Sequence, residues 1–203
     1  MPGTPWSSGA TASIRTVTST ARNGFALGEG AAALILESAA HAQSRGATPL
    51  GQINGYGIST DAVHITNPDP QGQIKAMRMA LNDAGLAPED IGYINAHGTA
   101  TLAGDLAEAM SIGEVFAGRR VPVSSTKALH GHLLGAGGAL EMLIALEALR
   151  RQRRPVAAHL SEPDPKCDLN LVRPNQDQGP AWQHAMSNSF AFGGTNAVLI
   201  VSA

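Results

Sequence analysis

The 203-residue sequence has little cysteine, few aromatic residues, little charge and no long apolar run, and each shortage excludes something. Its single cysteine, Cys167, cannot form an internal disulfide, which favours a reducing compartment. The longest uninterrupted apolar run, Ala31 to Leu36, is far too short to span a bilayer, and the N-terminus carries no apolar signal segment. We therefore expect a cytoplasmic protein with no membrane partner.

Charged residues make up only 15% of the sequence, and the formal net charge is −2 at pH 7. Nucleic-acid-binding proteins carry a clustered basic excess, so we expect no nucleic-acid partner. Hydrophobic residues make up 43%, which is enough for a packed core and excludes a disordered tail. So little charge indicates that part of the surface is buried against another chain or segment.

Strand-like and helix-like segments alternate along the chain. Residues 1–22, rich in Ser, Thr, Pro and Gly, favour a loop, whereas the apolar spacing of residues 71–84 predicts a helix that Gly85 ends. The alternation predicts an α/β fold with a mostly parallel sheet. The expected strands span residues 31–36, 51–58, 91–96, 121–124, 169–172, 184–189 and 197–201, and the expected helices lie within 38–45, 71–84, 105–116 and 133–152.

Three groups that can carry chemistry follow expected strands. His97 comes just after strand 91–96, and Lys127 and His132 follow strand 121–124. Because ligands bind beyond the carboxyl ends of parallel strands, we expect these side chains to meet at one edge of the sheet. The Gly-rich stretch 190–196 can add backbone N–H donors, and together these groups suit stabilisation of an enolate or a tetrahedral oxyanion. The alternative for any single histidine is an ordinary surface or core residue.

Other motifs carry less. Residues 135–140 lack the last glycine of a dinucleotide-binding fingerprint. His130 and His132 could be misread as a metal pair, but no carboxylate pattern lies near them, so we expect no metal site. Cys167 lies in a polar loop without a paired histidine, which favours a surface thiol over a nucleophile. The arginines within residues 150–154 are expected to complement the carboxyl end of a helix.

Three segments, residues 95–101, 124–135 and 188–196, resemble in order and spacing the two histidine motifs and the C-terminal glycine-rich motif of β-ketoacyl-acyl-carrier-protein synthases. They read Asn-Ala-His-Gly-Thr-Ala-Thr, Ser-Ser-Thr-Lys-Ala-Leu-His-Gly-His-Leu-Leu-Gly and Asn-Ser-Phe-Ala-Phe-Gly-Gly-Thr-Asn. Residues 23–30 and 61–68 also look familial, so the likeness runs from about Thr20 to the end. It is nearest to the stand-alone bacterial elongating enzymes of type II, second isoform.

The resemblance implies a thiolase-like fold, in which two similar α/β halves pair and the complete enzyme is a homodimer. Residues 1–50 would be the tail of the first half, and residues 51–203 the C-terminal ketosynthase domain. The implied activity is an acyltransferase reaction, the decarboxylative Claisen condensation of an acyl thioester with malonyl-acyl carrier protein in fatty acid or polyketide biosynthesis. Acyl carrier protein is the implied partner, and no resident cofactor is implied because phosphopantetheine arrives on that carrier.

The resemblance also implies roles for individual residues. His97 and His132 would hold the malonyl thioester carbonyl and stabilise its enolate, with Lys127 supporting them electrostatically. Phe192 would act as a gate and, with Gly193, supply oxyanion donors. The other implied residues are Thr99 and Thr101 at the pantetheine arm, Asp61 and Thr66 on a mobile substrate-side loop, and Asp105, Glu108 and Asn196 in support.

The family's nucleophilic cysteine belongs to the earlier half, and Cys167 does not match its motif. We therefore expect a fragment that needs its missing N-terminal half for turnover. Two alternatives stay open: a non-catalytic, truncated or chain-length-factor-like partner subunit, and a hydrolase that uses Cys167. His130 replaces a common Thr of close relatives, Ala191 a common Gly and Ala100 a common Ser, which leaves the acyl substrate open.

Overall fold

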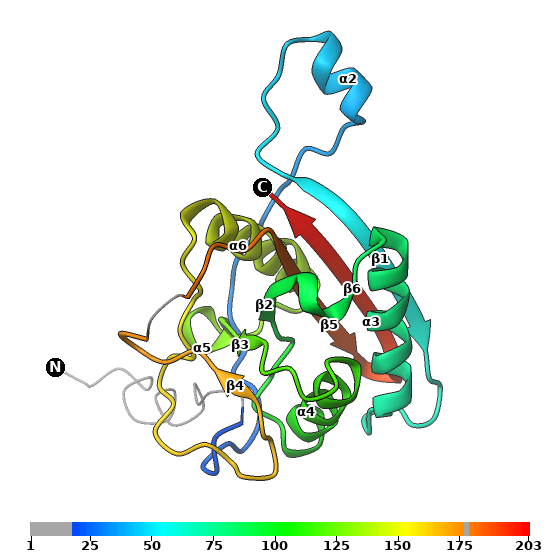
Figure 1. Ribbon diagram of the computed structural model, residues 1–203. Helices are drawn as coiled ribbons and strands as arrows, with labels where there is room; N and C mark the ends of the chain where they lie inside the picture. Colours follow the sequence, from blue (N-terminus) through cyan, green and yellow to red (C-terminus); the bar gives the residue numbers. More distant parts are fainter. Residues whose placement is uncertain (1–17, 177–178) are drawn as a thin grey trace, which may run out of the picture.

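A mixed sheet forms the centre of the computed structural model, which describes residues 18–176 and 179–203 (Figure 1). Within these residues the strands run in the order β1-β6-β5-β2-β3-β4. The part of the expected N-terminal loop before residue 18 lies outside the described residues. The strands are β1 Gln52–Thr60, β2 Ile91–Asn95, β3 Pro122–Ser124, β4 Asn170–Leu171, β5 His184–Ala191 and β6 Thr195–Ser202.

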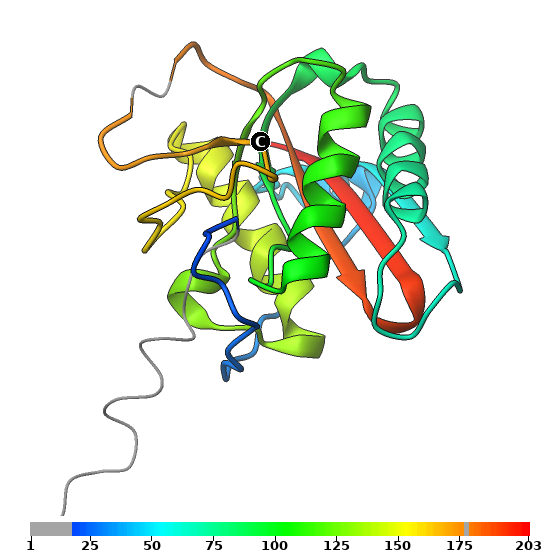
Figure 2. The ribbon, with the colours of Figure 1, turned by 90° about the horizontal axis from the view of Figure 1, so that it is seen from below.

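Helices cover both faces of this sheet (Figure 2). α3 (Pro70–Ala84) packs on β1 and β6 with α4 (Leu102–Val115) beside it, whereas α6 (Gly137–Arg151) lies on the opposite face against β5, β6 and β2. None of the helices in the described part of the chain is long and apolar enough to cross a membrane. The short helices are α2 (Ala39–Ser44), α5 (Lys127–His130) and the 3₁₀ helices Pro88–Asp90, Leu134–Ala136 and Phe192–Gly194.

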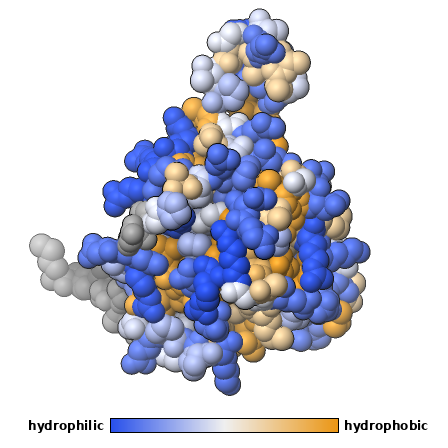
Figure 3. Space-filling view, viewed as in Figure 1, coloured by the Kyte–Doolittle hydropathy of each residue, from blue (hydrophilic) through white to orange (hydrophobic). Residues whose placement is uncertain are grey.

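Alternation along the central strands builds two cores, one on each face of the sheet. Ile94 of β2 and Met186 of β5 pack with α3 and α4, whereas the preceding residues, Tyr93 and Ala185, pack with α6. Successive strand side chains point to opposite faces, so each central strand serves both cores. The surface of the molecule seen in Figure 3 is mostly polar, with apolar residues visible between the polar ones.

Local signals place several element ends where the sequence predicts them. Ser38 caps α2 by accepting the His41 N–H at 3.2 Å, and Gly85 ends α3 in the left-handed conformation with φ of 65°. The expected strands at 51–58, 91–96, 121–124, 169–172, 184–189 and 197–201 and the expected helices at 38–45, 71–84 and 105–116 are confirmed to within a few residues.

The strand expected at residues 31–36 is wrong. The segment has no regular secondary structure, and Ile35 is 92% exposed. No backbone N–H from residue 29 to residue 37 donates a hydrogen bond to any described residue. A strand needs a partner edge, and an apolar run in a sequence does not show whether that edge is present in the same chain.

The expectation of a mostly parallel sheet holds only for the part formed by β5, β2, β3 and the edge strand β4. β2 is parallel to β3 and β5, and β3 is parallel to β4, but β6 is antiparallel to both β5 and β1. The tight connection Phe192–Gly194 between β5 and β6 allows only antiparallel pairing. The helix expected within 133–152 starts at Gly137, after a 3₁₀ turn, and α5 is not foreseen.

The sheet face on which α6 packs, called the inner face below, is left uncovered at its β1 side. Tyr56 and Ile58 of β1 remain 50% and 48% exposed, beside their β6 partners Leu199 and Ala197. Sheets of α/β proteins normally bury both faces, so this apolar strip is a surface that another polypeptide segment could cover.

Gly57 tests how closely α3 approaches β1. A Cβ at Gly57 would overlap Ala76 O in the backbone of α3, whereas Gly113 in α4 has open space around it. We expect Gly57→Ala to lower the free energy of unfolding by about 1–3 kcal/mol, because backbone cannot yield cheaply. The matched control Gly113→Ala should raise that free energy by about 0.5–1 kcal/mol, because alanine favours a helix. Urea unfolding of the chain measures both, and equal stability of the two variants would contradict the packing.

Candidate active site

The sheet brings the two predicted histidines together. β2 and β3 are parallel neighbours that end in register at Asn95 and Ser124. His97 follows β2, and His132 lies in the loop between α5 and α6. Their imidazole rings meet edge to face, with centroids 5.4 Å apart and planes at 84°. The prediction that both rings reach one edge of the sheet is confirmed.

A single buried carboxylate, Glu108 of α4, fixes the loop that carries His97. Its Oε1 accepts the His97 N–H at 2.9 Å and the Asn188 Nδ2–H at 3.0 Å, and its Oε2 accepts the Gly98 N–H at 2.8 Å. From the other side, the Ser125 hydroxyl donates to Gly98 O at 2.9 Å. The backbone that carries His97 is thus held by the side chains of Glu108 on α4 and Ser125 after β3, with Asn188 of β5 bound to the same carboxylate.

The two threonines of the first motif lie at the start of α4. Thr101 caps the helix by accepting the Gly104 N–H at 3.2 Å, and the hydroxyls of Thr99 and Thr101 are 3.2 Å apart. Both side chains are half-buried beside the His97 loop. A helix cap therefore accounts for Thr101 without any ligand.

His132 is held by a segment far away in the sequence. The His132 N–H donates to Ala26 O at 2.7 Å, and the Gly28 N–H donates to His132 O at 3.1 Å. The Phe25 ring packs edge-on against the imidazole, with centroids 5.7 Å apart. A Cβ at Gly28 would overlap His130 O, so glycine is required there. The likeness of residues 23–30 to the family indicates a functional role for this segment, but it does not predict the contact with His132.

Lys127 does not stand alone. Its ammonium group pairs with the Glu141 carboxylate of α6, and both side chains are almost fully buried. Sequence reasoning missed Glu141, and the signal that could have found it is an acidic residue on the otherwise apolar inner face of residues 137–151. A buried ion pair of this kind holds each partner because an unpaired charge would be costly.

The surroundings keep both imidazoles neutral. Burial, with the nearby charge of Lys127 and the His132 ring, holds the pKa of His97 well below its ordinary value. Burial and Lys127 also lower the pKa of His132. The Leu134 N–H donates to His132 Nδ1 at 3.3 Å, so the proton of the neutral ring sits on Nε2. Two neutral rings at this distance can donate to one negatively charged oxygen.

Asp105 and Glu108 form the buried acidic pair that the resemblance implies. Asp105 accepts the Thr18 N–H at 2.9 Å and the Ala100 N–H at 3.1 Å, and Arg22 Nε lies 3.6 Å from its Oδ2. Burial, together with the Glu108 charge, raises the pKa of Asp105 to about 7, and burial also raises the pKa of Glu108.

The glycine-rich turn after β5 lies near the site through Phe190, whose ring centroid is 6.1 Å from that of His97. Phe192, the implied gate, is 68% exposed, and Gly193 has φ of 77°. The Gly193 N–H donates to Ile65 O at 2.8 Å, so this amide is engaged rather than free to bind an oxyanion. Within the described residues no hydrogen bond links the turn to either imidazole.

The implied substrate-side loop is tied to that turn. The Asp61 N–H donates to Gly194 O at 3.0 Å, and Asp61 Oδ2 accepts the Asp69 N–H at 2.9 Å. A Cβ at Gly194, which has φ of 74°, would coincide with the Asp61 carboxylate. The buried Asn196 amide donates to Gly194 O at 2.9 Å. Asp61 and Asn196 therefore shape the turn from its two sides.

Thr66 lies at the exposed end of the same loop, where its N–H donates to His64 Nδ1 at 3.1 Å. No described contact joins it to the histidine pair. Ala191 adopts an extended conformation, with φ of −115°, so alanine fits there without strain in this arrangement. Ala100 is different, because its φ of 65° is unusual for a residue other than glycine.

Cys167 is not the surface thiol expected from its polar surroundings. It is 2% exposed, packed against the Arg22 guanidinium, whose Nη2 lies 3.7 Å from its Sγ. Burial raises the pKa of the thiol to about 11, which leaves almost no thiolate at neutral pH. The loop folds inward because Arg22 is itself buried there, which local polarity does not reveal.

In the described part of the chain, no group of three or more His, Cys, Asp or Glu side chains could hold a metal ion. The Oδ1 atoms of Asn95 and Asn188 are buried without a hydrogen-bond partner, although their Nδ2 groups donate to Glu141 O and Glu108 Oε1. The centre of the site thus keeps two unused acceptor oxygens.

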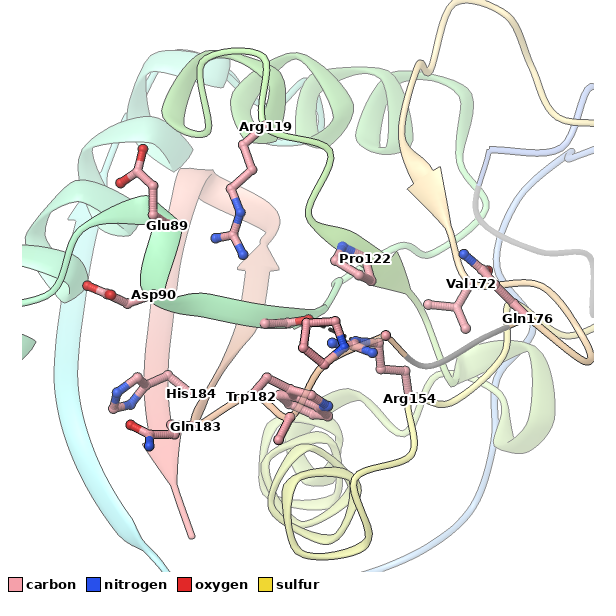
Figure 4. Close-up of a pocket in the computed structure, with 14 residues that line it drawn as sticks. Glu89, Asp90, Arg119, Pro122, Arg154, Val172, Gln176, Trp182, Gln183 and His184 are labelled. Carbon is pink, nitrogen blue, oxygen red and sulfur yellow. Dashed lines mark hydrogen bonds between the residues drawn. The ribbon is translucent and has the colours of Figure 1, made fainter.

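A groove of about 520 Å³ lies at the opposite, amino-terminal edge of the parallel strands, away from His97 and His132 (Figure 4). Arg154 crosses it, stacking 4.8 Å from the Trp182 ring centroid and donating to Gly92 O at 2.9 Å. Arg150 and Arg151 pair with Glu147 at the end of α6. The labelled lining residues are Glu89, Asp90, Arg119, Pro122, Arg154, Val172, Gln176, Trp182, Gln183 and His184.

Known proteins are similar to this chain in both sequence and fold. Residues 50–161 match the family described as beta-ketoacyl synthase, C-terminal domain. The 3-oxoacyl-[acyl-carrier-protein] synthase 2 of Coxiella burnetii (strain RSA 493 / Nine Mile phase I) is 48% identical over 185 residues, which cover 89% of this chain and 44% of the relative. The chain thus spans less than half the length of the curated relatives it matches.

Two solved structures superpose closely. The ishigamide ketosynthase/chain length factor has 36% identity and a TM-score of 0.87, covering 94% of this chain and 47% of that one. A type II polyketide ketosynthase, solved with its acyl-carrier protein and bound to the hexaketide, has 31% identity and a TM-score of 0.88, covering 95% and 48%. Both likenesses extend over nearly all of this chain and about half of each neighbour.

Lys127→Met should destabilise the chain by about 3–5 kcal/mol, because it leaves Glu141 buried without its cation. The double variant Lys127→Met/Glu141→Gln should recover most of that loss, since no charge is then stranded. Urea unfolding at neutral pH measures both. A double variant no more stable than the single one would show that the pair does not carry the effect.

The same double variant should raise the pKa of both His97 and His132, because Lys127 lowers each of them. In the unmodified chain, the His97 Cε1–H resonance should stay at its neutral position as pH falls from about 8 through 6.5. NMR titration measures the change. Arg78→Met, which removes an exposed cation paired with Glu114, is the control and should leave the curves unchanged. A protonated His97 at neutral pH would contradict the electrostatics.

Proposed function

The chain belongs to the β-ketoacyl synthase family, and on that premise we propose that it forms the part of a condensing enzyme that binds and decarboxylates malonyl-acyl carrier protein. The complete enzyme would be an acyltransferase, a 3-oxoacyl-acyl-carrier-protein synthase of fatty acid or polyketide biosynthesis. The observation that carries the proposal is the pair of neutral imidazoles, His97 and His132, whose ring centroids are 5.4 Å apart at one sheet edge.

The chemistry needs two donors aimed at one oxygen. The malonyl thioester carbonyl oxygen would accept N–H bonds from His132 Nε2 and from the His97 ring. Cleavage of the bond to the carboxylate releases CO₂ and leaves its electron pair in an enolate, whose oxygen keeps both hydrogen bonds. The enolate carbon then attacks the acyl thioester carbonyl, and the enzyme cysteine that carried the acyl group leaves as a thiolate. Each neutral ring still carries one N–H, so each can offer one hydrogen bond to this oxygen.

The nucleophilic cysteine must come from elsewhere. Cys167 is buried and its pKa is raised to about 11, which argues against it as a nucleophile and against the hydrolase alternative. We propose that the N-terminal half of a synthase supplies the cysteine and covers the apolar strip of Tyr56 and Ile58 and the unpaired segment 29–37. The 44% coverage of the relatives supports this.

We keep acyl carrier protein as the proposed partner, because one superposing ketosynthase was solved with its acyl-carrier protein. Its phosphopantetheine arm would reach the histidines past Thr99 and Thr101, so the chain would need no resident cofactor. Phe192, with Gly193, remains the proposed gate, because Phe192 is exposed on the glycine-rich turn that follows Phe190 beside the site. We further propose a homodimeric complete enzyme located in the cytoplasm.

His97→Ala tests the proposal in the native enzyme, captured by antibody from its source cells. We expect CO₂ release from malonyl-acyl carrier protein to fall about 10²–10³-fold, since one of two enolate donors is lost. The control His159→Asn removes an exposed imidazole with φ of 58°, a conformation that asparagine tolerates, and should release CO₂ normally.

Unchanged decarboxylation in His97→Ala would overturn the proposed role. Intact-mass analysis of the captured protein separates the remaining alternative. A mass well above 20.9 kDa with an upstream cysteine supports a condensing enzyme, whereas a mass near 20.9 kDa without CO₂ release indicates a non-catalytic partner subunit.

A further inference from the structure

Besides the Lys127–Glu141 pair, the structure holds a buried ion cluster of Arg22, Asp105 and Asp164 near the start of α4. The proposed reaction does not use this cluster. Arg22, with only 2% of its side chain exposed, stands between Asp105, which is fully buried, and Asp164 at the surface edge. Its Nη1 donates to Asp164 Oδ2 at 2.7 Å and to Ser19 O at 2.9 Å, while its Nε faces Asp105 Oδ2 at 3.6 Å.

Arg22 joins two parts of the chain that are distant in sequence. Segment 18–22 runs alongside residues 162–164, with the Thr20 N–H donating to Glu162 O at 3.0 Å and a bridge between Ser19 and Pro163. On its other side, Arg22 faces the carboxylate that reaches into the His97 loop. The guanidinium is thus the link between an outer loop and the active-site loop.

Asp105 holds the one strained residue of that loop. Ala100, buried and with φ of 65°, donates its N–H to Asp105 Oδ1 at 3.1 Å and accepts the Gly24 N–H at 2.9 Å. A left-handed alanine costs free energy, so its neighbours must enforce it. The Asp105 carboxylate accepts two backbone N–H groups, and an ionised carboxylate serves two donors whereas a protonated one turns an O–H toward one of them.

We propose that Arg22 is a positioning residue: its guanidinium faces the Asp105 carboxylate and favours the ionised form that holds Ala100 in its left-handed turn, and so sets the loop that presents His97 and Thr99. The titratable groups facing Asp105 are Glu108 on its own helix, Arg22 on segment 18–22 and Cys167 on the loop 164–168. Of these, Arg22 is the cation. The role in catalysis rests on the proposed function, whereas the role in holding the loop does not.

Hydrogen exchange at the Ala100 and Thr18 amides of the full chain reads the loop directly. Burial raises the pKa of Asp105 to about 7, and Arg22 opposes that rise. In the unmodified chain, both protection factors should therefore fall as pH drops through about 7. In Arg22→Met the midpoint should move upward by about one pH unit or more, with protection restored at alkaline pH. Arg22→Lys, which keeps the charge, should keep the original midpoint.

Two further variants keep the test decisive. Asp105→Asn cannot ionise, so its Ala100 protection should be low and independent of pH. Arg78→Met, an exposed and distant arginine, should behave as the unmodified chain. A loss of protection in Arg22→Met that is the same at every pH, or a midpoint that does not move, would overturn the proposal, because a purely structural arginine would act that way.

Activity of the native enzyme separates the two claims. The pH profile of CO₂ release from malonyl-acyl carrier protein should shift to higher pH in Arg22→Met, and Arg22→Lys should restore it. If the unmodified enzyme releases no CO₂ at all, the proposed function fails while the exchange data still decide the loop. If it does release CO₂ and Arg22→Met leaves the profile unshifted, the positioning role in catalysis fails alone.

Discussion

The Glu108 carboxylate is the group on which the geometry of the site depends. It accepts N–H groups from His97 and Gly98 and the amide of Asn188, and so fixes α4, β5 and the first histidine loop relative to one another. A buried carboxylate satisfied by three donors rigidifies its surroundings, because losing any donor would leave charge without compensation. This anchoring fixes the loop of His97, whose ring centroid lies 5.4 Å from that of His132.

Charge is distributed around this anchor in pairs. Lys127 faces Glu141 on α6, and Arg22 faces Asp105 on α4. Lys127 has a second role, because its positive charge adds to burial in lowering the pKa of both imidazoles. Burial and this cation keep the histidines neutral at the place where the proposed enolate oxygen would lie, and the cation is itself balanced by a carboxylate.

The inner side of the sheet is as informative as the site. α3 and α4 cover the outer face, but α6 covers only part of the inner face and leaves Tyr56 and Ile58 exposed. In residues 29–37 no backbone N–H donates to a described residue, although Leu34 packs against the α6 core and Glu37 pairs with Arg45. Both are surfaces that the proposed N-terminal half of a synthase would cover.

The sequence by itself determined the local features and the family. Helix ends at Ser38 and Gly85 follow from caps formed by neighbouring residues, and the placement of His97 and His132 at one edge follows from strand order. Three ordered motifs identified the β-ketoacyl synthase likeness that the comparisons bear out. These inferences succeed because they depend on short stretches of chain or on rules of sheet topology.

Tertiary structure alone decided the rest. The burial of Cys167 and Arg22, the pairing of Lys127 with Glu141 and the contact of residues 26–28 with His132 all join positions far apart in the sequence. The apolar run 31–36 reads as a strand, but its pairing depends on an edge that the described residues do not provide. Burial and pairing are properties of what surrounds a residue in space, and neither composition nor periodicity carries that information.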